Sequence, residues 1–191
     1  MRKSDEEILS AIAEKDSAAV AELYDRYSRL IYGALLRMLR STDDAEDVLQ
    51  EVFVQVWLKA GTYKPDLGAP KFWLVRIAHN RAINLIRSKR AKMKQTEIPI
   101  PDTDSPAAAE LVAADLFAET SNAEESAYTV RAMNKLPKDQ AQLLDMAFFQ
   151  GYSHSEISEK TNLPLGTVKT RIRNGLLALR ESLEFLNENK T

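Results

Sequence analysis

The chain has 191 residues, of which 45% are hydrophobic and 28% are charged, and its formal net charge is −2. This length suits one domain of ordinary size or two small ones, and the composition is typical of soluble helical proteins rather than disordered or fibrous ones. Cysteine is absent, which excludes disulfides, thiol nucleophiles and Cys-based zinc sites. No apolar run approaches the ~18 residues of a membrane span, and MRKSDEEILS becomes acidic where a signal peptide needs its apolar segment.

Histidine is represented only by His79 and His154, which lie far apart in the sequence. A metal site or catalytic site centred on histidine is therefore not expected. We expect both imidazoles to face solvent.

The first part of the chain predicts two helices. Ser4, followed by acidic residues, predicts an N-cap that opens a short helix, and Asp16 or Ser17 caps a longer one. The apolar residues of the longer helix recur at intervals of three and four: Val20, Leu23, Tyr24, Tyr27, Leu30, Ile31, Ala34, Leu35 and Met38.

A third helix is predicted near STDDAEDVLQEVFVQVW (41–57), capped by Ser41 or Thr42. Its apolar side consists of Ala45, Val48, Leu49, Val52, Phe53 and Val56. Its other side is acidic and rich in amides, with Glu46, Asp47, Gln50, Glu51 and Gln55. The residues alone leave open whether this face meets water or binds a partner protein.

A loop, KAGTYKPDLGAP (59–70), precedes a fourth helix, KFWLVRIAHNRAINLIRSKR (71–90). No acidic residue occurs from Leu67 to Thr96, and the same stretch is strongly basic, with Lys71, Arg76, Arg81, Arg87, Lys89, Arg90, Lys92 and Lys94. A basic block of this kind indicates a polyanionic partner, or else a solvated helix face.

The pattern of the fourth helix divides it into apolar and polar sides. The core residues are expected to be Trp73, Leu74, Ile77, Ala78, Ile83 and Leu85, which leaves Arg76, Asn80, Arg81, Asn84 and Arg87 on more polar sides. Rings, amides and bases together suit single-stranded nucleic acid. Trp73 at helical spacing is more often core than a stacking platform, so Phe72 is the better candidate for an exposed ring.

The segment after the basic fourth helix is acidic. Between Gln95 and Val130 there is no Lys or Arg, while TEIPIPDTDSP places prolines where a helix cannot continue. We predict an all-α chain of two small helical domains, 1–95 and 127–187, joined by an acidic flexible linker, 96–126.

The last domain contains a helix-turn-helix pattern. Leu136, Leu143, Leu144, Met146, Ala147 and Phe148 are predicted to pack upstream, and Gly151 allows the turn before the motif. A short helix around 156–160, a break at 162–164 and a second helix from Gly166–Thr167 then follow.

The second helix of the motif is predicted to bury one side, consisting of Val168, Ile172, Leu176, Leu179 and Leu183. The opposite side presents Thr170, Arg173, Asn174 and Leu177, flanked by Lys169 and Arg171. Such side chains can read base edges in a major groove and bind phosphates.

Four blocks together carry a family resemblance: DAEDVLQEVFVQVW (44–57), FWLVRIAHNRAINLIR (72–87), LPKDQAQLLDMAFFQGYSHSEIS (136–158) and LPLGTVKTRIRNGLLALRE (163–181). They resemble the blocks of the extracytoplasmic-function sigma factors of bacterial RNA polymerase. The resemblance implies that 1–95 is sigma region 2 and 127–187 is sigma region 4. It implies a cytoplasmic protein that binds core polymerase, directs it to promoters and helps melt the DNA, with no catalytic activity, cofactor, metal or small-molecule substrate.

The resemblance also implies roles for particular residues. The polymerase-docking face would be Asp44, Glu46, Asp47, Gln50 and Glu51. The −10 element would be bound by Lys71, Phe72, Arg76, Asn80, Arg81, Asn84 and Arg87, with the loop 62–71 holding a flipped base. The −35 element would be read by Thr167, Lys169, Thr170, Arg171, Arg173 and Asn174.

An anti-sigma protein, often membrane-anchored, is the further partner that the resemblance implies, so the chain would be held at the membrane when inactive and lie on the nucleoid when active. Family members often have an arginine or aromatic residue in place of Arg173 or Asn174, so the promoter sequence does not carry over. A stand-alone helix-turn-helix regulator is the alternative, although it leaves 1–95 without a role. A nucleic-acid enzyme is disfavoured because the acids at 43–47 occupy successive helix positions and do not converge on one ion.

Overall fold

The computed structural model describes residues 3–94 and 136–188, with side chains through residues 93 and 178, and every regular element in these ranges is helical. The chain divides into two compact units, Met1–Ala82 and Ile83–Thr191, and the fourth helix crosses the boundary between them. No helix in the described ranges combines the length and hydropathy needed to cross a bilayer. The predicted linker 96–126 lies outside the described residues.

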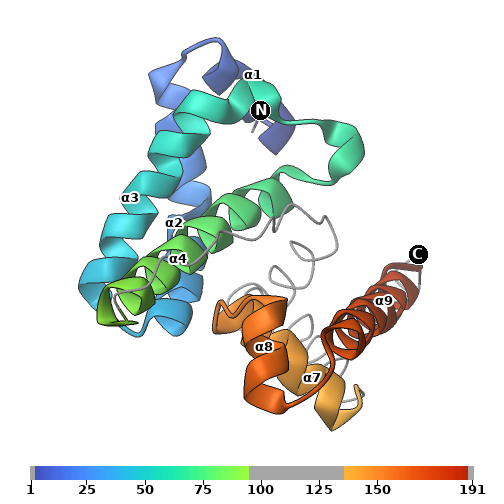
Figure 1. Ribbon diagram of the computed structural model, residues 1–191. Helices are drawn as coiled ribbons and strands as arrows, with labels where there is room; N and C mark the ends of the chain where they lie inside the picture. The colour runs from blue at the N-terminus through green and yellow to red at the C-terminus, as the bar shows by residue number, and fades with distance from the viewer. Residues whose placement is uncertain (1–2, 95–135, 189–191) are drawn as a thin grey trace. The chain divides into compact units, whose positions relative to one another are not determined.

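The first unit is built from helices and short helical turns, and the sequence predicted the caps of the first three helices (Figure 1). They are α1 (Asp5–Ala13), α2 (Ser17–Leu39), α3 (Thr42–Lys59), the short turns η1 (Ala60–Thr62) and η2 (Pro65–Leu67), and α4 (Pro70–Lys94). Ser4 forms a capping box with Glu7, and Asp16 and Ser41 are the caps of α2 and α3. Each cap satisfies backbone N–H groups that a helix start leaves unpaired, so each helix begins where its polar side chain stands.

The core of the first unit lies where α1, α2, α3 and the start of α4 meet. Its fully buried large side chains include Ile8, Leu9, Ile12, Leu23, Ile31, Leu35 and Leu74. Tyr24 departs from the predicted apolar stripe because it is 42% exposed, with its ring centroid 4.8 Å from that of Phe53.

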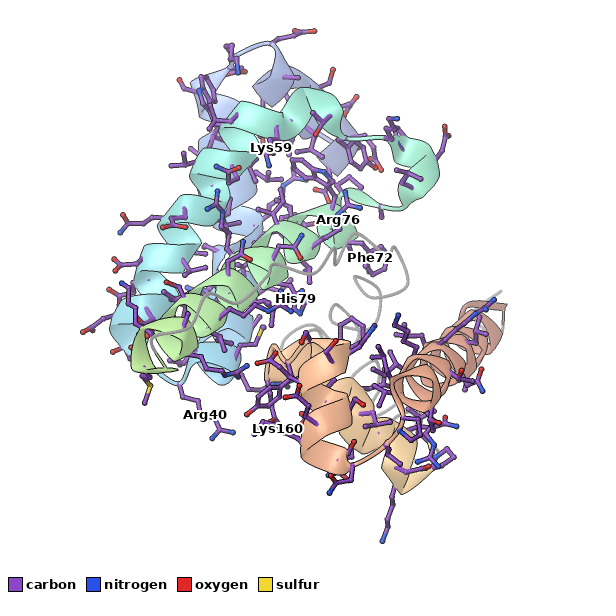
Figure 2. All side chains as sticks on the ribbon, viewed as in Figure 1. Arg40, Lys59, Phe72, Arg76, His79 and Lys160 are labelled. Carbon is purple, nitrogen blue, oxygen red and sulfur yellow. The ribbon has the colours of Figure 1, made fainter. Side chains whose placement is uncertain are left out.

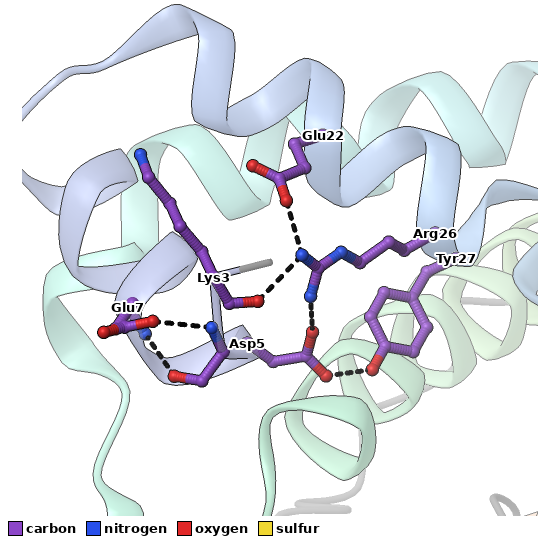
Figure 3. Close-up of polar contacts among 7 residues, drawn as sticks. Lys3, Asp5, Glu7, Glu22, Arg26 and Tyr27 are labelled. Carbon is purple, nitrogen blue, oxygen red and sulfur yellow. Dashed lines mark hydrogen bonds and ion pairs between the residues drawn. The ribbon is translucent and has the colours of Figure 1, made fainter. Parts of the chain in front are cut away.

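A polar cluster fastens α1 to α2 (Figure 3). Arg26 Nη1 donates to Asp5 Oδ1 at 2.7 Å, the Tyr27 hydroxyl donates to Asp5 Oδ2, and Arg26 also pairs with Glu22. Burial and the bond to Asp5 raise the pKa of the Tyr27 phenol. The sequence pattern had placed Tyr27 in an apolar stripe, but its hydroxyl reaches a carboxylate at the edge of the core.

The second unit contains the C-terminal part of α4 and the elements α7 (Lys138–Leu144), η3 (Asp145–Phe149, a π-helical turn), α8 (His154–Thr161) and α9 (Leu165–Glu188). Most of the predicted core is confirmed, because Leu136, Leu143, Leu144, Met146, Ala147, Phe148, Val168 and Ile172 are all buried. Leu176 is only partly buried, and the side chains of Leu179 and Leu183 lie outside the described residues. Gly151 has φ +70°, the left-handed conformation that its predicted turn requires.

Helices α7 and α9 approach each other closely at Gly175. A Cβ atom added there would lie 2.8 Å from Leu144 Cδ1 and 3.6 Å from Gln140 Cβ. Since Leu144 is fully buried, its side chain has little room to move. The absence of a side chain at Gly175 therefore sets the distance between the two helices.

Gly175→Ala should destabilise the protein. Overpacking costs about 1–3 kcal/mol, whereas alanine gains up to ~1 kcal/mol over glycine inside a helix, so we expect a net loss of about 1 kcal/mol. Urea unfolding monitored by circular dichroism measures this loss.

Gly33→Ala is the matched control, because Gly33 is an exposed residue of α2 whose added Cβ would meet nothing within 4 Å. It should stabilise the protein by about 0.5–1 kcal/mol. If both substitutions stabilise the protein equally, the close approach of α7 and α9 is wrong.

Candidate nucleic-acid and protein interfaces

The outer face of α3 carries the acidic set that the sequence singled out. Glu46, Asp47, Gln50 and Glu51 are exposed and Asp44 is partly exposed. The opposite side of α3 packs into the core through Ala45, Val48, Leu49, Val52, Phe53 and Val56. The predicted division of this helix into a core side and an acidic surface side is therefore confirmed.

The same face of α3 continues into an apolar end. Val54 is 56% exposed and Leu58 is 61% exposed, and they follow Gln50 at successive intervals of four residues. Neither residue was among those predicted for this face, although their spacing from Gln50 places them on the acidic side rather than on the core side. The outer face of α3 thus combines carboxylates and an amide with exposed apolar surface.

The start of α4 presents basic and aromatic residues. Phe72 and Arg76, one helical turn apart, extend from the same part of α4 (Figure 2), and Lys71 Nζ lies 5.0 Å from the Phe72 ring centroid. Phe72 is partly buried rather than freely exposed, whereas Trp73 is only 8% exposed and belongs to the core, as its helical spacing favoured.

The loop before α4 is held by Tyr63. Its hydroxyl donates to the Gly68 carbonyl at 3.0 Å, and its ring meets that of Trp73 edge-on with centroids 6.0 Å apart. Gly68 has φ +118°, which a residue with a side chain rarely adopts. The loop is therefore fixed to the helix that follows it.

Further along α4, Asn84 is exposed while Asn80 and Arg81 are partly exposed. Arg81 Nη1 lies 3.5 Å from Glu51 Oε2, so this pair links a predicted DNA residue on α4 to a predicted docking residue on α3. An ion pair this exposed contributes little to stability. Glu51 nevertheless neutralises part of the charge that Arg81 would offer to DNA.

Two residues of α4 are buried against expectation. His79 is 4% exposed and Arg87 is 5% exposed, so the predictions that His79 faces solvent and that Arg87 lies on a polar side were wrong. The reason is helical spacing, because both lie four residues from buried Ile83 and therefore share its side of the helix.

Arg87 is satisfied by the backbone of the second unit. Its Nε donates to the Gly151 carbonyl at 2.9 Å, and Arg90 Nη2 donates to the Gln150 carbonyl at 2.6 Å. The Arg90 guanidinium also stacks 3.9 Å from the Tyr152 ring centroid. Burial lowers the pKa of Arg87, and Glu156 opposes that effect by favouring the cation.

Helices α8 and α9 form the predicted helix-turn-helix. Ser153 and Glu156 make a capping box at the start of α8, and Asn162 ends that helix with φ +55°. The helix α8 begins at His154 rather than Glu156, because Ser153 caps it two residues earlier than predicted. The hydroxyl of Ser158 donates to the Leu163 carbonyl and holds the turn.

The exposed side of α9 contains the residues predicted to face DNA. Lys169, Thr170, Arg173 and Asn174 are exposed and Thr167 is partly exposed, while Val168 and Ile172 are 0% and 4% exposed. Leu177 extends this side and is 46% exposed. The burial of one side of α9 thus leaves a polar row that a DNA groove can receive.

Arg171 differs from the rest of that predicted set. It is partly buried, and its Nη1 lies 2.9 Å from Asp139 Oδ2 on α7. Arg171 therefore lies on the flank of α9, against a carboxylate of α7, and is not part of the exposed row.

Comparison with known proteins identifies these two sets of helices. Residues 23–92 match the family model Sigma-70 region 2, and residues 127–179 match Sigma-70, region 4. The chain is 32% identical over 177 residues to the ECF RNA polymerase sigma factor SigK of Mycobacterium sp. (strain JLS), covering 92% of this chain and 89% of that protein. The chain belongs to the ECF sigma factors.

A further relative and a solved structure also match nearly the whole length of this sigma factor. SigK of Mycobacterium tuberculosis (strain ATCC 25177 / H37Ra) is 30% identical over 177 residues, covering 93% of this chain and 92% of that protein. Rhodobacter sphaeroides SigE, solved in complex with the anti-sigma ChrR, is 30% identical, with a TM-score of 0.46 and coverage of 95% of this chain and 99% of that one.

Family membership establishes the class of activity. A sigma factor is a non-catalytic subunit of RNA polymerase that directs transcription initiation, and sigma factors bind core polymerase and promoters. In the described ranges of this sigma factor, no three His, Asp or Glu side chains gather where they could hold a metal ion.

His154 is the first residue of α8, the first helix of the motif. Its side chain is exposed, as predicted, but neighbouring protein atoms remove part of its hydration. This desolvation lowers the pKa of His154, and the like charge of Lys169 lowers it further.

Acidification should therefore destabilise the sigma factor through His154. Because its pKa is lower in the folded state than the ordinary 6.5, the unfolded chain binds the proton more tightly, and stability falls as pH drops below about 6.5. The free energy of unfolding of His154→Gln should fall less between pH 7.5 and pH 5.5 than that of the wild type. Equal losses in the two proteins would show that His154 does not titrate abnormally.

Proposed function

We propose that this sigma factor docks on core polymerase through the outer face of α3, binds the melted −10 element along α4 and reads the −35 element with α9. The observation that carries the proposal is that the exposed sides of α3 and α9 have different chemistry. The first is acidic and apolar, and the second is basic and rich in hydrogen-bonding side chains. One face suits a protein and the other suits DNA.

The docking proposal rests on the exposed part of α3. Glu46, Asp47, Gln50 and Glu51 offer acceptors to basic side chains, and Asp44 extends this face toward the helix start. Exposed Val54 and Leu58 supply the apolar contact that the buried centre of a protein interface needs.

The −10 proposal rests on the row from Lys71 through Asn84. Lys71 and Arg76 supply charge for phosphates, the Phe72 ring can stack on an unpaired base, and the amides of Asn80 and Asn84 can read base edges. Arg81 shares its charge with Glu51, and Arg87 contacts DNA only after its bond to the Gly151 carbonyl breaks.

The −35 proposal rests on the exposed row of α9. Arg173 and Asn174 are suited to guanine and adenine edges, while Thr167, Lys169 and Thr170 suit the phosphates and remaining base contacts. Arg171 is part of the predicted set but is paired with Asp139.

We also assign 1–95 to region 2, 127–187 to region 4 and the acidic segment 96–126 to the tether between them. The chain would work in the cytoplasm on the nucleoid, and an anti-sigma protein, often membrane-anchored in this family, would hold it inactive by covering the same faces. A stand-alone regulator would need only the helix-turn-helix, whereas the region 2 match at 23–92 favours a polymerase subunit.

Reversing charge on α3 tests the docking face. Glu46→Lys combined with Gln50→Lys should weaken binding to core polymerase by about tenfold or more, because like charges would then oppose the basic partner. Titration of labelled protein with core polymerase measures the loss.

The matched control combines Glu14→Lys with Asp25→Asn, at two exposed acids outside α3, and changes the net charge by the same amount. This control should bind core polymerase as the wild type does. If the α3 variant binds core polymerase as tightly as the wild type does, the acidic face of α3 is a solvated surface and not the docking site.

Arg173→Ala tests the upstream contact. One good base contact is worth about 1–3 kcal/mol of discrimination, so transcription from promoters that differ only upstream should lose about fivefold or more in selectivity. Docking on core polymerase should not change, and reduced docking would show that this side of α9 was assigned to the wrong partner.

A further inference from the structure

A pair of opposite charges joins the helix-turn-helix to α7. Asp139 Oδ2 lies 2.9 Å from Arg171 Nη1, and Asp139 Oδ1 accepts a hydrogen bond from the Gln140 backbone N–H at 3.0 Å. Both oxygens of the carboxylate are thus engaged. The carboxylate is held in place on α7, and the guanidinium is held against it.

Close packing of α7 against α9 brings this pair together. Gly175, one turn after Arg171 on the same side of α9, allows Gln140 and Leu144 to approach α9 closely. At about 100° per residue, Arg171 lies about 60° around the helix from Asn174 and about 160° from Arg173. Arg171 therefore lies beside the exposed row, on the flank of α9.

We propose that Asp139 neutralises Arg171 and thereby limits the sequence-independent affinity of the recognition helix for DNA. The inference rests on the proposed −35 contact of α9. A helix in the major groove has phosphates along its flanks, and each phosphate neutralised by a free cation adds to non-specific binding. Arg171 paired with Asp139 adds no net charge at that flank.

The proposal makes Asp139 a positioning residue that favours selectivity. Because the carboxylate neutralises Arg171, the affinity for DNA comes from Arg173, Asn174 and the other exposed side chains. These side chains can distinguish bases. Removing the charge of Asp139 converts Arg171 into an additional phosphate contact. Affinity then rises for every sequence, and the ratio between the correct and an incorrect promoter falls.

The salt dependence of DNA binding tests this proposal. Wild-type holoenzyme, made from core polymerase and the full chain, first selects a duplex from a pool whose upstream segment is randomised. Each holoenzyme is then titrated against that duplex and against the same duplex with the upstream segment scrambled. One additional phosphate contact steepens the slope of log affinity against log salt by about 0.9, which corresponds to about threefold more affinity lost between 50 and 200 mM salt.

We expect Asp139→Asn to show this steeper slope on both duplexes and a lower ratio between them. Asp139→Glu should behave as the wild type because it retains the charge. The double variant Asp139→Asn with Arg171→Gln should also retain the wild-type slope, because both charges are gone.

Three results would overturn the proposal. Asp139→Asn could keep the wild-type slope, or Glu159→Gln, which removes another exposed acid of the motif, could steepen it equally. The double variant could instead lose about 0.9 of slope, which would place Arg171 on a phosphate in the wild type. If thermal unfolding shows that Asp139→Asn is destabilised, the double variant decides the question.

Failure of the proposed −35 contact would give a different result from failure of the role of Asp139. In that case wild-type holoenzyme would select no upstream segment from the pool. A wild type that selects its duplex, together with an Asp139→Asn variant of identical slope, would overturn the role of Asp139 alone.

Discussion

A helix that buries one side in a protein core has only its other side to offer to a partner, and this constraint governs both candidate interfaces. In α9, burial of Val168 and Ile172 directs Arg173 and Asn174 outward. In α3, burial of the stripe from Ala45 to Val56 leaves the carboxylates outside. The chemistry of each surface therefore follows from the helical period of the residues beneath it.

Several basic residues predicted to bind DNA already have partners within the protein. Arg81 pairs with Glu51, Arg171 pairs with Asp139, and Arg87 donates to the Gly151 carbonyl. The formal net charge of −2 follows from the 28 acidic and 26 basic residues, whereas these contacts decide which of the cations are available to DNA. On α9, the exposed side chains of Lys169, Arg173 and Asn174 could meet DNA without breaking such a contact.

The sequence predicted well what depends on local rules. Caps at Ser4 and Asp16, the turn at Gly151 and the burial of Val168 and Ile172 all follow from residue type and spacing, and all are confirmed. The family resemblance was equally accessible because four blocks occur in the expected order. Matches to regions 2 and 4 confirm it.

What the sequence did not reveal depends on contacts between distant segments. Burial of His79 and Arg87 was missed because basic residues were assigned to polar sides by type, although their spacing from Ile83 pointed inward. The acceptor for Arg87 lies more than sixty positions away, and the partner of Arg171 lies on another helix. No local pattern identifies such partners, whereas Val54 and Leu58 could have been found from their spacing relative to Gln50.

Transcription by core polymerase on a library of randomised promoters tests the central claim most directly. With the full chain added, initiation should be confined to templates that share an upstream and a downstream motif at a fixed spacing. Core polymerase alone should select neither motif. Initiation without a preferred upstream motif would contradict the assignment of α9, and the absence of any selected template would contradict the account as a whole.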